Sequence, residues 1–433
     1  MIGFLLHQHS IRKPMSKIKI SRTLSFGAGF PPATEKLPAA SLFVVGALVF
    51  SQLFCMAEEN PTHCLTPSSR APSLAATPNA ETLPQPSPAN SQSATVTSAS
   101  VDTSAWPAKP WPKGMVWIPG GEFDMGGVGP EARKDEFPIH RVRVDGYWMD
   151  ATEISNAEFR RFVEATGYIT TAEKKPEWEE IKKQLPPNTP KPDDSVFVPG
   201  SLLFIPTNGP VKLDNPTQWW RWVQGTDWKH PLGPKSSLTA NEDNLPVVHV
   251  SWDDAVAYCQ WAGKRLPTEA EWEYASLGGL PARRFTWGDE PPSATFHPAN
   301  LWQGDFPYNP KALDGYILSA PVDSDKPNAY GLHHMIGNVW EWCSDWFRED
   351  YYKMLTDAGT TAVNPQGPVD SFDPQEPSVP KRVNRGGSFL CDAAYCASYR
   401  PAARMKTSPD SGLIHTGFRP VVSDADWRKN ESK

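Results

Sequence analysis

Two cysteines near the C-terminus, Cys391 and Cys396, have the residue type and spacing that most directly indicate chemistry. They lie in the run Arg385-Gly-Gly-Ser-Phe-Leu-Cys-Asp-Ala-Ala-Tyr-Cys, where four residues separate two soft sulfur ligands. Residues five apart point to opposite faces of a straight strand and lie off one another's face on a helix, so the backbone must bend for the sulfurs to meet. A bent segment with two convergent thiols can be a disulfide, a redox pair or a clip for a soft metal ion.

Each interpretation of the cysteine pair has its own chemical basis. A disulfide across so small a loop would stabilise the protein by only about 2 kcal/mol in the chain-entropy account. Thiolates are soft ligands that select Cu(I) over hard cations, so a dithiol also suits copper binding or redox work. Zinc would usually need four ligands, and no CxxC or HxxxH lies nearby to complete the set. Polar side chains flank the pair at Ser388, Tyr395 and Arg400.

Carboxylate and amide side chains in glycine-containing loops form a second group. They occur in the runs Asn300-Leu-Trp-Gln-Gly-Asp305, Asp314-Gly-Tyr316 and Gly337-Asn-Val-Trp-Glu-Trp342. Such loops suit Ca²⁺, which takes oxygen ligands from carboxylates, amides and backbone carbonyls. Solvated polar loops would have the same composition, so both interpretations stay open at this point.

The other cysteines and histidines of the folded region fit a core better than a reaction. Cys259 and Cys343 occupy apolar positions and are predicted to be small buried side chains. His249, in Val247-Val-His-Val-Ser-Trp252, is predicted to pack inside a strand rather than to act as a base. The sequence contains no GxSxG, HExxH or phosphate-binding glycine loop, so it lacks these signatures of hydrolases and nucleotide-binding proteins.

The composition predicts a globular protein with many loops. The chain has 433 residues and a net charge of −7, which argues against nucleic-acid binding because nucleic-acid binders normally carry a basic patch. A hydrophobic content of 39% with 18 Trp supports a packed core. The 46 Pro and 30 Gly predict less regular secondary structure than an average domain contains.

The N-terminus is typical of an exported protein. Basic residues precede a short apolar run from Leu42 to Phe50, which has the length of a signal-peptide core and is short for a transmembrane helix. Small residues allow cleavage after Ala57, while lipidation of Cys55 and an uncleaved membrane anchor are alternatives. Met15 is an alternative start. We therefore expect a periplasmic or extracellular protein, whether cleaved or membrane-anchored.

The remaining chain divides by composition. Residues 1–57 are predicted to be the signal peptide or membrane anchor. Residues 58–109 are rich in Pro, Ser, Ala, Thr and Asn and are predicted to be a disordered linker, because they cannot bury enough apolar surface to offset their ordering entropy. Residues 110–423 are predicted to form one catalytic domain, followed by a tail over 424–433.

Within that domain, local patterns predict several elements. Residues 115–127 are predicted to form a hairpin that turns at Pro119-Gly120-Gly121, and 140–149 alternate as a strand. Three capping boxes predict helices. These helices begin at Ser155, Ser251 and Thr268, with Glu158, Asp254 and Glu271 completing the boxes, and end at Gly167, Gly263 and Gly278. Beyond Gly279 we expect few helices, and short strands in long connections.

The stretch from about 174 to 246 is rich in proline and is predicted to be irregular. Its runs Gln218-Trp-Trp-Arg-Trp222 and Asp227-Trp-Lys-His-Pro231 place many aromatic side chains in loops. Exposed aromatic side chains in loops would form a binding surface. The alternative is that they cover the core where regular structure is sparse.

Four motifs together resemble the signature of the formylglycine-generating enzyme (sulfatase-modifying factor) family. They are the long run from Val248 to Tyr274, Gly337-Asn-Val-Trp-Glu-Trp-Cys-Ser-Asp-Trp346, Arg385-Gly-Gly-Ser388 and Gly417-Phe-Arg419. The resemblance covers roughly residues 112–422. Many members share this framework without the thiols. This chain has both, spaced as in the oxidase, and it keeps Pro409-Asp-Ser411 downstream.

The resemblance implies a fold and a reaction. The fold would be an irregular α/β (α+β) architecture, low in regular secondary structure and related to C-type lectin domains. The reaction would oxidise a cysteine in an unfolded sulfatase Cys-x-Pro-x-Arg segment to Cα-formylglycine, with O₂ as oxidant and an external thiol as reductant. Cys391 and Cys396 would hold Cu(I). We expect a monomer.

The resemblance also implies roles for side chains around the pair. Ser388 and Tyr395 would lie beside the copper and the O₂ pocket. Trp340 would line the active site, and Arg400 would lie close to the cysteines. All four are therefore expected at one site with Cys391 and Cys396.

Two calcium sites are implied in the same way. Asn300 and Asp314 would bind the first ion through side chains, and Leu301 and Tyr316 through carbonyls. The second would use the carbonyls of Gly337 and Val339 and the carboxylate of Glu341. His334 stands where an asparagine is usual in that second site. Imidazole nitrogen is a poor calcium ligand, so we expect this site to be empty or altered.

Two rival functions remain. The first is a non-catalytic, lectin-like binding module of the same superfamily, against which the retained thiol pair argues. The second is a different oxidase or sulfur-chemistry enzyme on this fold. That class would typically need histidine ligands to iron, often in an added helical domain, and no such domain is evident in the sequence.

Overall fold

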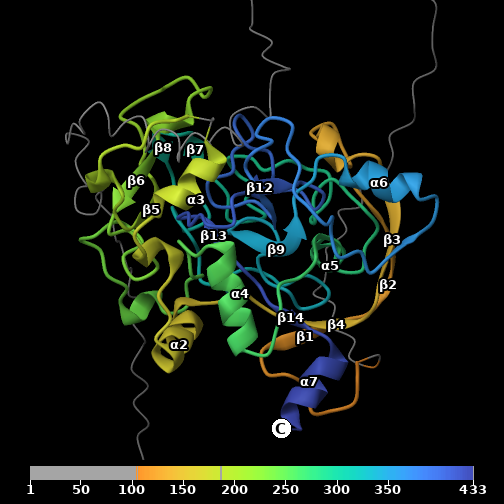
Figure 1. The fold of residues 1–433 in the computed structure, drawn as a ribbon. Coiled ribbons are helices and arrows are strands. Elements are labelled where there is room, and N and C mark those ends of the chain that lie inside the picture. The colour runs from red at the N-terminus through yellow and green to blue at the C-terminus, as the bar shows by residue number, and fades with distance from the viewer. Residues whose placement is uncertain (1–103, 105, 186–187, 433) are drawn as a thin grey trace, which may run out of the picture.

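The computed structural model describes residues 104, 106–185 and 188–432 as an irregular arrangement of small sheets and short helices (Figure 1). The central sheet has the strand order β12 (Met405–Thr407), β11 (Arg382–Arg385), β9 (Trp340–Trp346) and β13 (Thr416–Gly417). In Figure 1 it lies between the β5 and β6 side of the molecule and the β2 and β3 side. The predicted irregular α/β class is confirmed.

Four smaller sheets surround the central one. They are β1 (Met115–Ile118) with β4 (Tyr147–Asp150) and β14 (Val421–Val422); β10 (Ala362–Val363) with β3 (His140–Val144) and β2 (Gly121–Met125); β5 (Gly200–Phe204) with β6 (Trp220–Gln224); and β7 (Gly304–Asp305) with β8 (Asn309–Pro310). The helices are α2 (Asn156–Thr166), α3 (Trp178–Ile181), α4 (Trp252–Trp261), α5 (Glu269–Ser276), α6 (Tyr351–Asp357) and α7 (Asp424–Glu431).

The predicted hairpin over residues 115–127 is wrong. β1 pairs with β4 and β2 pairs with β3, so Pro119-Gly120 joins two sheets instead of turning one strand back on its neighbour. The predicted strand over 140–149 is divided in the same way, between β3 and β4. A Cβ on Gly120 would lie 2.9 Å from the Gly146 nitrogen, so the two bends pack backbone against backbone.

The three predicted helices are confirmed as α2, α4 and α5. Each has the expected capping box, in which the cap hydroxyl accepts from the third amide and the third carboxylate accepts from the cap amide. Gly167 ends α2 in the left-handed conformation. Helix α4 ends at Trp261 and α5 at Ser276, two residues before the expected glycines. Helix packing brings Phe162 of α2 against Tyr258 of α4.

The aromatic run in the proline-rich stretch covers the core. Trp219 is fully buried, Trp220 lies in β6, and Trp228 packs beside α2. The β5–β6 pair itself was not expected in a region predicted to be irregular. Its register joins Leu202 to Trp222 and Phe204 to Trp220, which turns Trp220 toward the cysteine segment.

The ends of the domain pack together. The Trp106 and Trp111 rings lie against Trp148 of β4, and Trp148 donates a hydrogen bond to Asp424 of α7 at 3.0 Å. Helix α7 thus fills most of the segment predicted to be a tail. The predicted signal, and nearly all of the predicted linker, lie outside the described residues. Among the helices that the structure does describe, none has the length and apolar character needed to cross a bilayer.

Candidate active site

The backbone between Cys391 and Cys396 bends as the spacing required. The Cys396 amide donates to the Asp392 carbonyl at 2.7 Å, and the Cys391 amide donates to the Ser388 carbonyl at 2.9 Å. These turns bring the two sulfurs to 3.1 Å. Both cysteines are free thiols, since an S–S bond would be about 2.05 Å long. The convergent dithiol is therefore present in the structure.

Two glycines allow the chain to enter this bend from β11. Gly386 and Gly387 both have positive φ, at 100° and 78°. A Cβ on Gly386 would lie 3.1 Å from both the Met335 carbonyl and the Trp272 ring. The two glycines of the Arg385-Gly-Gly-Ser388 motif therefore adopt a backbone conformation that residues with a side chain rarely adopt.

The two thiols differ in acidity. The hydrogen bond with Cys391 lowers the pKa of Cys396 to about 6, with further help from Ser398 and the nearby Arg133. Burial raises the pKa of Cys391, and its interaction with Cys396 adds to the shift. Near neutral pH the metal-free pair is accordingly a Cys396 thiolate that accepts a hydrogen bond from the Cys391 thiol.

Arg133 supports Cys396 from a distant part of the chain. Its Nη1 donates to Ser398 Oγ at 2.8 Å, and its Nη2 donates to the Arg404 carbonyl. Arg133 precedes the short 3₁₀ turn η1 (Lys134–Glu136), in the segment between β2 and β3. Sequence reasoning missed this residue because neither charge nor spacing connects it with a cysteine more than 260 positions away.

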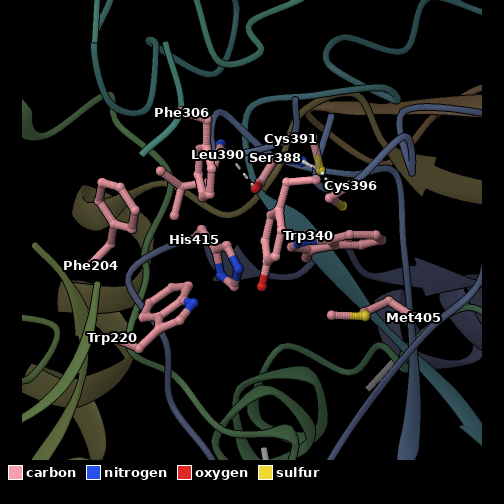
Figure 2. Close-up of a pocket in the computed structure, with 11 residues that line it drawn as sticks. Phe204, Trp220, Phe306, Trp340, Ser388, Leu390, Cys391, Cys396, Met405 and His415 are labelled. Atoms are coloured by element: carbon pink, nitrogen blue, oxygen red, sulfur yellow. Dashed lines mark hydrogen bonds between the residues drawn. The ribbon is translucent and has the colours of Figure 1, made fainter. Parts of the chain in front are cut away.

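A small cavity, here called the first cavity, adjoins the pair. It contains Cys391, Cys396, Ser388, Tyr395 and Trp340, so five of the six predicted catalytic residues meet there. Figure 2 shows the cysteines and Ser388 on one side of this cavity and Trp220 and Phe204 on the other. The volume open to the centre of a water-sized molecule is about 20 Å³, enough for one such molecule.

The cavity wall is mostly apolar and aromatic. The Phe306 and Tyr395 rings stack with centroids 4.8 Å apart. Trp220 packs edge-on against His415, which burial holds neutral by lowering its pKa to about 3. His415, Trp220 and Phe306 were not predicted as site residues. The only sequence signal for His415 was its place just before Gly417-Phe-Arg419.

Arg400 is near the pair in sequence but does not line the first cavity. Its guanidinium makes a two-pronged ion pair with Glu136, at 2.7 and 2.6 Å, and both residues are buried. Its Nε donates to the Ala397 carbonyl at 3.0 Å. Arg400 thus fixes the segment that follows Cys396.

The first predicted calcium site contains side-chain oxygens that accept no hydrogen bond. Asn300 Oδ1 and Asp314 Oδ2 are buried and have no hydrogen-bond partner. Asn300 Nδ2 donates to the Leu318 carbonyl at 3.0 Å and Asp314 Oδ1 accepts from the Tyr316 amide at 2.9 Å, so the single side-chain oxygen of Asn300 and the second carboxylate oxygen of Asp314 are left over. Buried oxygens without donors are costly, and a calcium ion would satisfy them. These residues fit the ion.

The second predicted calcium site does not fit. Glu341 accepts hydrogen bonds from Arg419, the shortest at 2.7 Å, and from Trp272 Nε1 at 2.8 Å, so its charge is already neutralised. His334 Nε2 lies 3.1 Å from the Pro321 carbonyl and 3.2 Å from Ser324 Oγ. Glu341 is thus committed to Arg419 and Trp272, and we assign no cation to these residues.

The other cysteines and His249 are buried as predicted, but His249 does not lie in the predicted strand. Cys259 and Cys343 are buried, and burial raises the pKa of both thiols above the ordinary range. His249 is fully buried, and its Nδ1 lies 2.8 Å from Ser201 Oγ. Burial lowers the pKa of His249 to about 4, so it stays neutral. It lies in a bend with positive φ and not in a strand.

Comparison with known proteins places the whole described domain in one group. The family model for the sulfatase-modifying factor enzyme 1-like domain matches residues 103–424. The chain is 45% identical over 309 residues to the formylglycine-generating enzyme of Thermomonospora curvata, covering 71% of this chain and 92% of that protein. It is 45% identical over 306 residues to the formylglycine-generating enzyme of Mus musculus, covering 70% and 74%.

More distant matches extend over a similar share of the chain. An inactive C-alpha-formylglycine-generating enzyme 2 of Bos taurus is 35% identical over 316 residues, covering 70% of this chain and 86% of that protein. Among solved structures, PvdO from Pseudomonas aeruginosa aligns with a TM-score of 0.46 and 21% identity, covering 71% of this chain and 93% of that one.

Proposed function

The chain belongs to the formylglycine-generating enzyme (sulfatase-modifying factor) family, and we propose that it converts a sulfatase cysteine to Cα-formylglycine with O₂ and a thiol reductant. The observation that carries the proposal is the free Cys391–Cys396 pair, 3.1 Å apart beside a cavity of one-molecule size. Because a protein named inactive shares the framework, the framework alone does not carry this proposal.

Full reduction of O₂ takes four electrons, of which oxidation of the substrate cysteine supplies two, so two more must come from another reductant. In the balanced reaction the Cβ of a peptidyl cysteine loses its sulfur as H₂S and gains one oxygen atom of O₂. The second oxygen atom leaves as water. Two molecules of an external thiol supply the two missing electrons and two protons, and they leave joined as a disulfide.

Cys391 and Cys396 are the residues that would hold copper. Both are sulfur donors on one bent segment, and one of them is already a thiolate near neutral pH, which suits a soft ion. When bound, Cu(I) would supply the means of activating O₂ and accepting the substrate thiolate.

The aromatic wall prepares the first cavity for a small apolar molecule. Stacking of Phe306 on Tyr395 and packing of Trp220 on His415 leave few polar groups and little room for water. An O₂ molecule is about the size of the space that remains. Ser388 is fully buried beside the pair, and its backbone amide lies 3.4 Å from Cys391 Sγ. This donor holds the Cys391 sulfur in position.

The first calcium site would act on the cysteines through the backbone. Asn300, Asp314 and the carbonyls of Leu301 and Tyr316 would hold the ion. The next residue, Trp302, donates its amide hydrogen to the Cys391 carbonyl at 3.1 Å. A bound ion would therefore stiffen the loop that supports Cys391.

We propose an unfolded sulfatase segment of the form Cys-x-Pro-x-Arg as the substrate. We also propose that the protein works as a monomer after export to the periplasm or the outside of the cell, with or without a membrane anchor. Export would bring it to substrates that are still unfolded after secretion.

A direct experiment tests the reaction. Protein loaded with Cu(I) is incubated in air with dithiothreitol and a synthetic Cys-x-Pro-x-Arg peptide, and the peptide is analysed by mass spectrometry for the aldehyde. A peptide with serine in place of the cysteine is the matched control. Intact copper binding without conversion of the cysteine peptide would contradict the proposal and favour a binding module.

A further inference from the structure

A second cavity reaches Cys391 from a different group of loops. It is formed by the segment 292–305, by Lys311 and Leu313, and by residues that follow Cys391 in the chain. The volume open to water-sized molecules is about 300 Å³, against about 20 Å³ in the first cavity. Cys391 lines both cavities, so a molecule larger than O₂ that enters the second cavity lies next to this residue.

The second cavity carries charges of both signs. Asp305 and Asp392 contribute carboxylates, and Lys311 contributes an ammonium group. Asp305 accepts a hydrogen bond from Asn309 through one oxygen, and Asp392 accepts one from the Ala394 amide through one oxygen. Within the described part of the chain no ion pair involves Asp305, Asp392 or Lys311. These groups are therefore available to a ligand that carries both charges.

The hydroxyl of a largely buried tyrosine also opens on this cavity. Tyr399 is only 5% exposed, and its ring stacks on Phe285 with centroids 5.7 Å apart. It lines the second cavity, and its hydroxyl makes no hydrogen bond to any residue that the structure describes. The hydroxyl is thus accessible from the cavity and can donate a hydrogen bond to a ligand.

We propose that the second cavity binds a small zwitterionic thiol and places its sulfur beside Cys391. The ammonium group of the ligand pairs with Asp305 and Asp392. Its carboxylate pairs with Lys311 and accepts from the Tyr399 hydroxyl. The inference rests on the proposed function, which requires an external thiol, and it names the chemical class of that thiol and the place where it binds.

The step at this site is the reduction of the pair after O₂, the oxidant of the proposed reaction, has oxidised it to a Cys391–Cys396 disulfide. The ligand thiolate attacks Cys391 Sγ of a Cys391–Cys396 disulfide, which forms a mixed disulfide and releases Cys396 as a thiolate. A second thiol attacks the ligand sulfur of the mixed disulfide, forms the ligand disulfide and releases Cys391. Two thiols lose two electrons, the protein disulfide gains them, and the two protons pass to the two cysteines.

Reduction of the oxidised, metal-free protein tests the site without any sulfatase peptide. The full chain is oxidised with diamide and then exposed to L-cysteine, which is zwitterionic, or to dithiothreitol, which is uncharged. Samples are quenched with an alkylating reagent, and mass spectrometry of the peptide containing Cys391 and Cys396 gives the rate. The variants are Asp305→Lys and Lys311→Glu, with Lys326→Glu, on the exposed surface away from the cavity, as the matched control.

The site predicts a difference between the two reductants. Asp305→Lys and Lys311→Glu should slow reduction by L-cysteine about tenfold, because each reverses a charge that pairs with the ligand. Reduction by dithiothreitol should stay the same, and Lys326→Glu should change neither rate. Unchanged rates with L-cysteine would overturn the proposal, as would equal slowing with both thiols.

The same variants separate this inference from the proposed function. If aldehyde forms with dithiothreitol but the L-cysteine rates do not change, the reaction stands and the thiol site is wrong. If no aldehyde forms but the L-cysteine rates fall selectively, the thiol site stands and the reaction is wrong. A raised KM for the sulfatase peptide, with unchanged reduction by L-cysteine, would assign the second cavity to the peptide and overturn the proposal.

Discussion

The Trp302 amide donates a hydrogen bond to the Cys391 carbonyl at 3.1 Å, which joins the loop of the first proposed calcium site directly to the cysteine pair. The loop carries the unsatisfied oxygens of Asn300 and Asp314, two residues and twelve residues away from Trp302 in the chain. A change in the order of this loop is therefore transmitted to Cys391 through one backbone contact.

Removal of calcium should destabilise the protein. At a calcium concentration 100 times the dissociation constant, a bound ion stabilises the folded state by about 2.7 kcal/mol. A chelator should lower the Tm of the wild type, and Asp314→Asn should abolish the difference between calcium and chelator. Asp305→Asn changes the same loop region outside the site, so this variant should keep the Tm difference between calcium and chelator. An equal chelator effect in Asp314→Asn would show that calcium binds elsewhere.

The acidity of Cys396 should be visible in its reactivity. Because the thiolate is the nucleophile and the pKa of Cys396 is lowered to about 6, alkylation by iodoacetamide in the metal-free protein should fall as the pH drops through about 6. Arg133→Gln removes a nearby positive charge and the hydrogen bond to Ser398, so the midpoint should move to higher pH. Stopped samples analysed by mass spectrometry give the profile. If the pH midpoint of alkylation lay near that of an ordinary cysteine in both proteins, Cys396 would not be a thiolate that accepts a hydrogen bond from Cys391.

Loss of Arg400 should act through stability. Arg400→Met removes the two-pronged partner of buried Glu136 and leaves only the longer contact with Arg133 at 3.8 Å, so it should cost up to roughly 3–5 kcal/mol of unfolding free energy. Arg400→Met with Glu136→Gln should recover much of that loss, because no charge is then left unpaired. Urea unfolding measures both. If Arg400→Met abolished turnover while its stability stayed at the wild-type value, Arg400 would be a catalytic residue and not a positioning residue.

The two sulfurs should be needed together. Cys391→Ala and Cys396→Ala should each abolish tight copper binding and aldehyde formation, because each removes one of two soft ligands. Cys259→Ala removes a buried thiol of another cluster and should keep both properties, with a modest loss of stability. Copper competition assays and peptide mass spectrometry check the three variants. Unchanged turnover in either active-site variant would refute the dithiolate site.

Features set by local interactions could be predicted from the sequence. Ser155 and Glu158 lie three residues apart, and their reciprocal hydrogen bonds require no other part of the chain. The spacing of Cys391 and Cys396 likewise showed that the short segment between them has to bend if their sulfurs are to meet. Sheet pairing is non-local, so Pro119-Gly120 looked like a hairpin turn although the partners of its flanking strands, β4 and β3, lie further along the chain.

The rest of the site depends on contacts between distant segments. Glu136 meets Arg400, and Arg133 meets Ser398, only because the loop between β2 and β3 folds onto the cysteine segment. His415 is an isolated histidine with no spacing that marks a site, and its role as a cavity wall depends on Trp220 in β6. Such residues carry no pattern in the sequence that would distinguish them from ordinary core residues.

The central claim is that the Cys391–Cys396 site couples O₂ to the oxidation of a peptidyl cysteine. The most direct measurement follows O₂ consumption and aldehyde formation in the same sample, with copper-loaded protein, dithiothreitol and the Cys-x-Pro-x-Arg peptide. The balanced reaction predicts equal amounts of O₂ consumed and aldehyde formed, after subtraction of O₂ uptake with the serine peptide. Copper-loaded protein that leaves the cysteine peptide unchanged, or that forms aldehyde without consuming O₂, would contradict the claim.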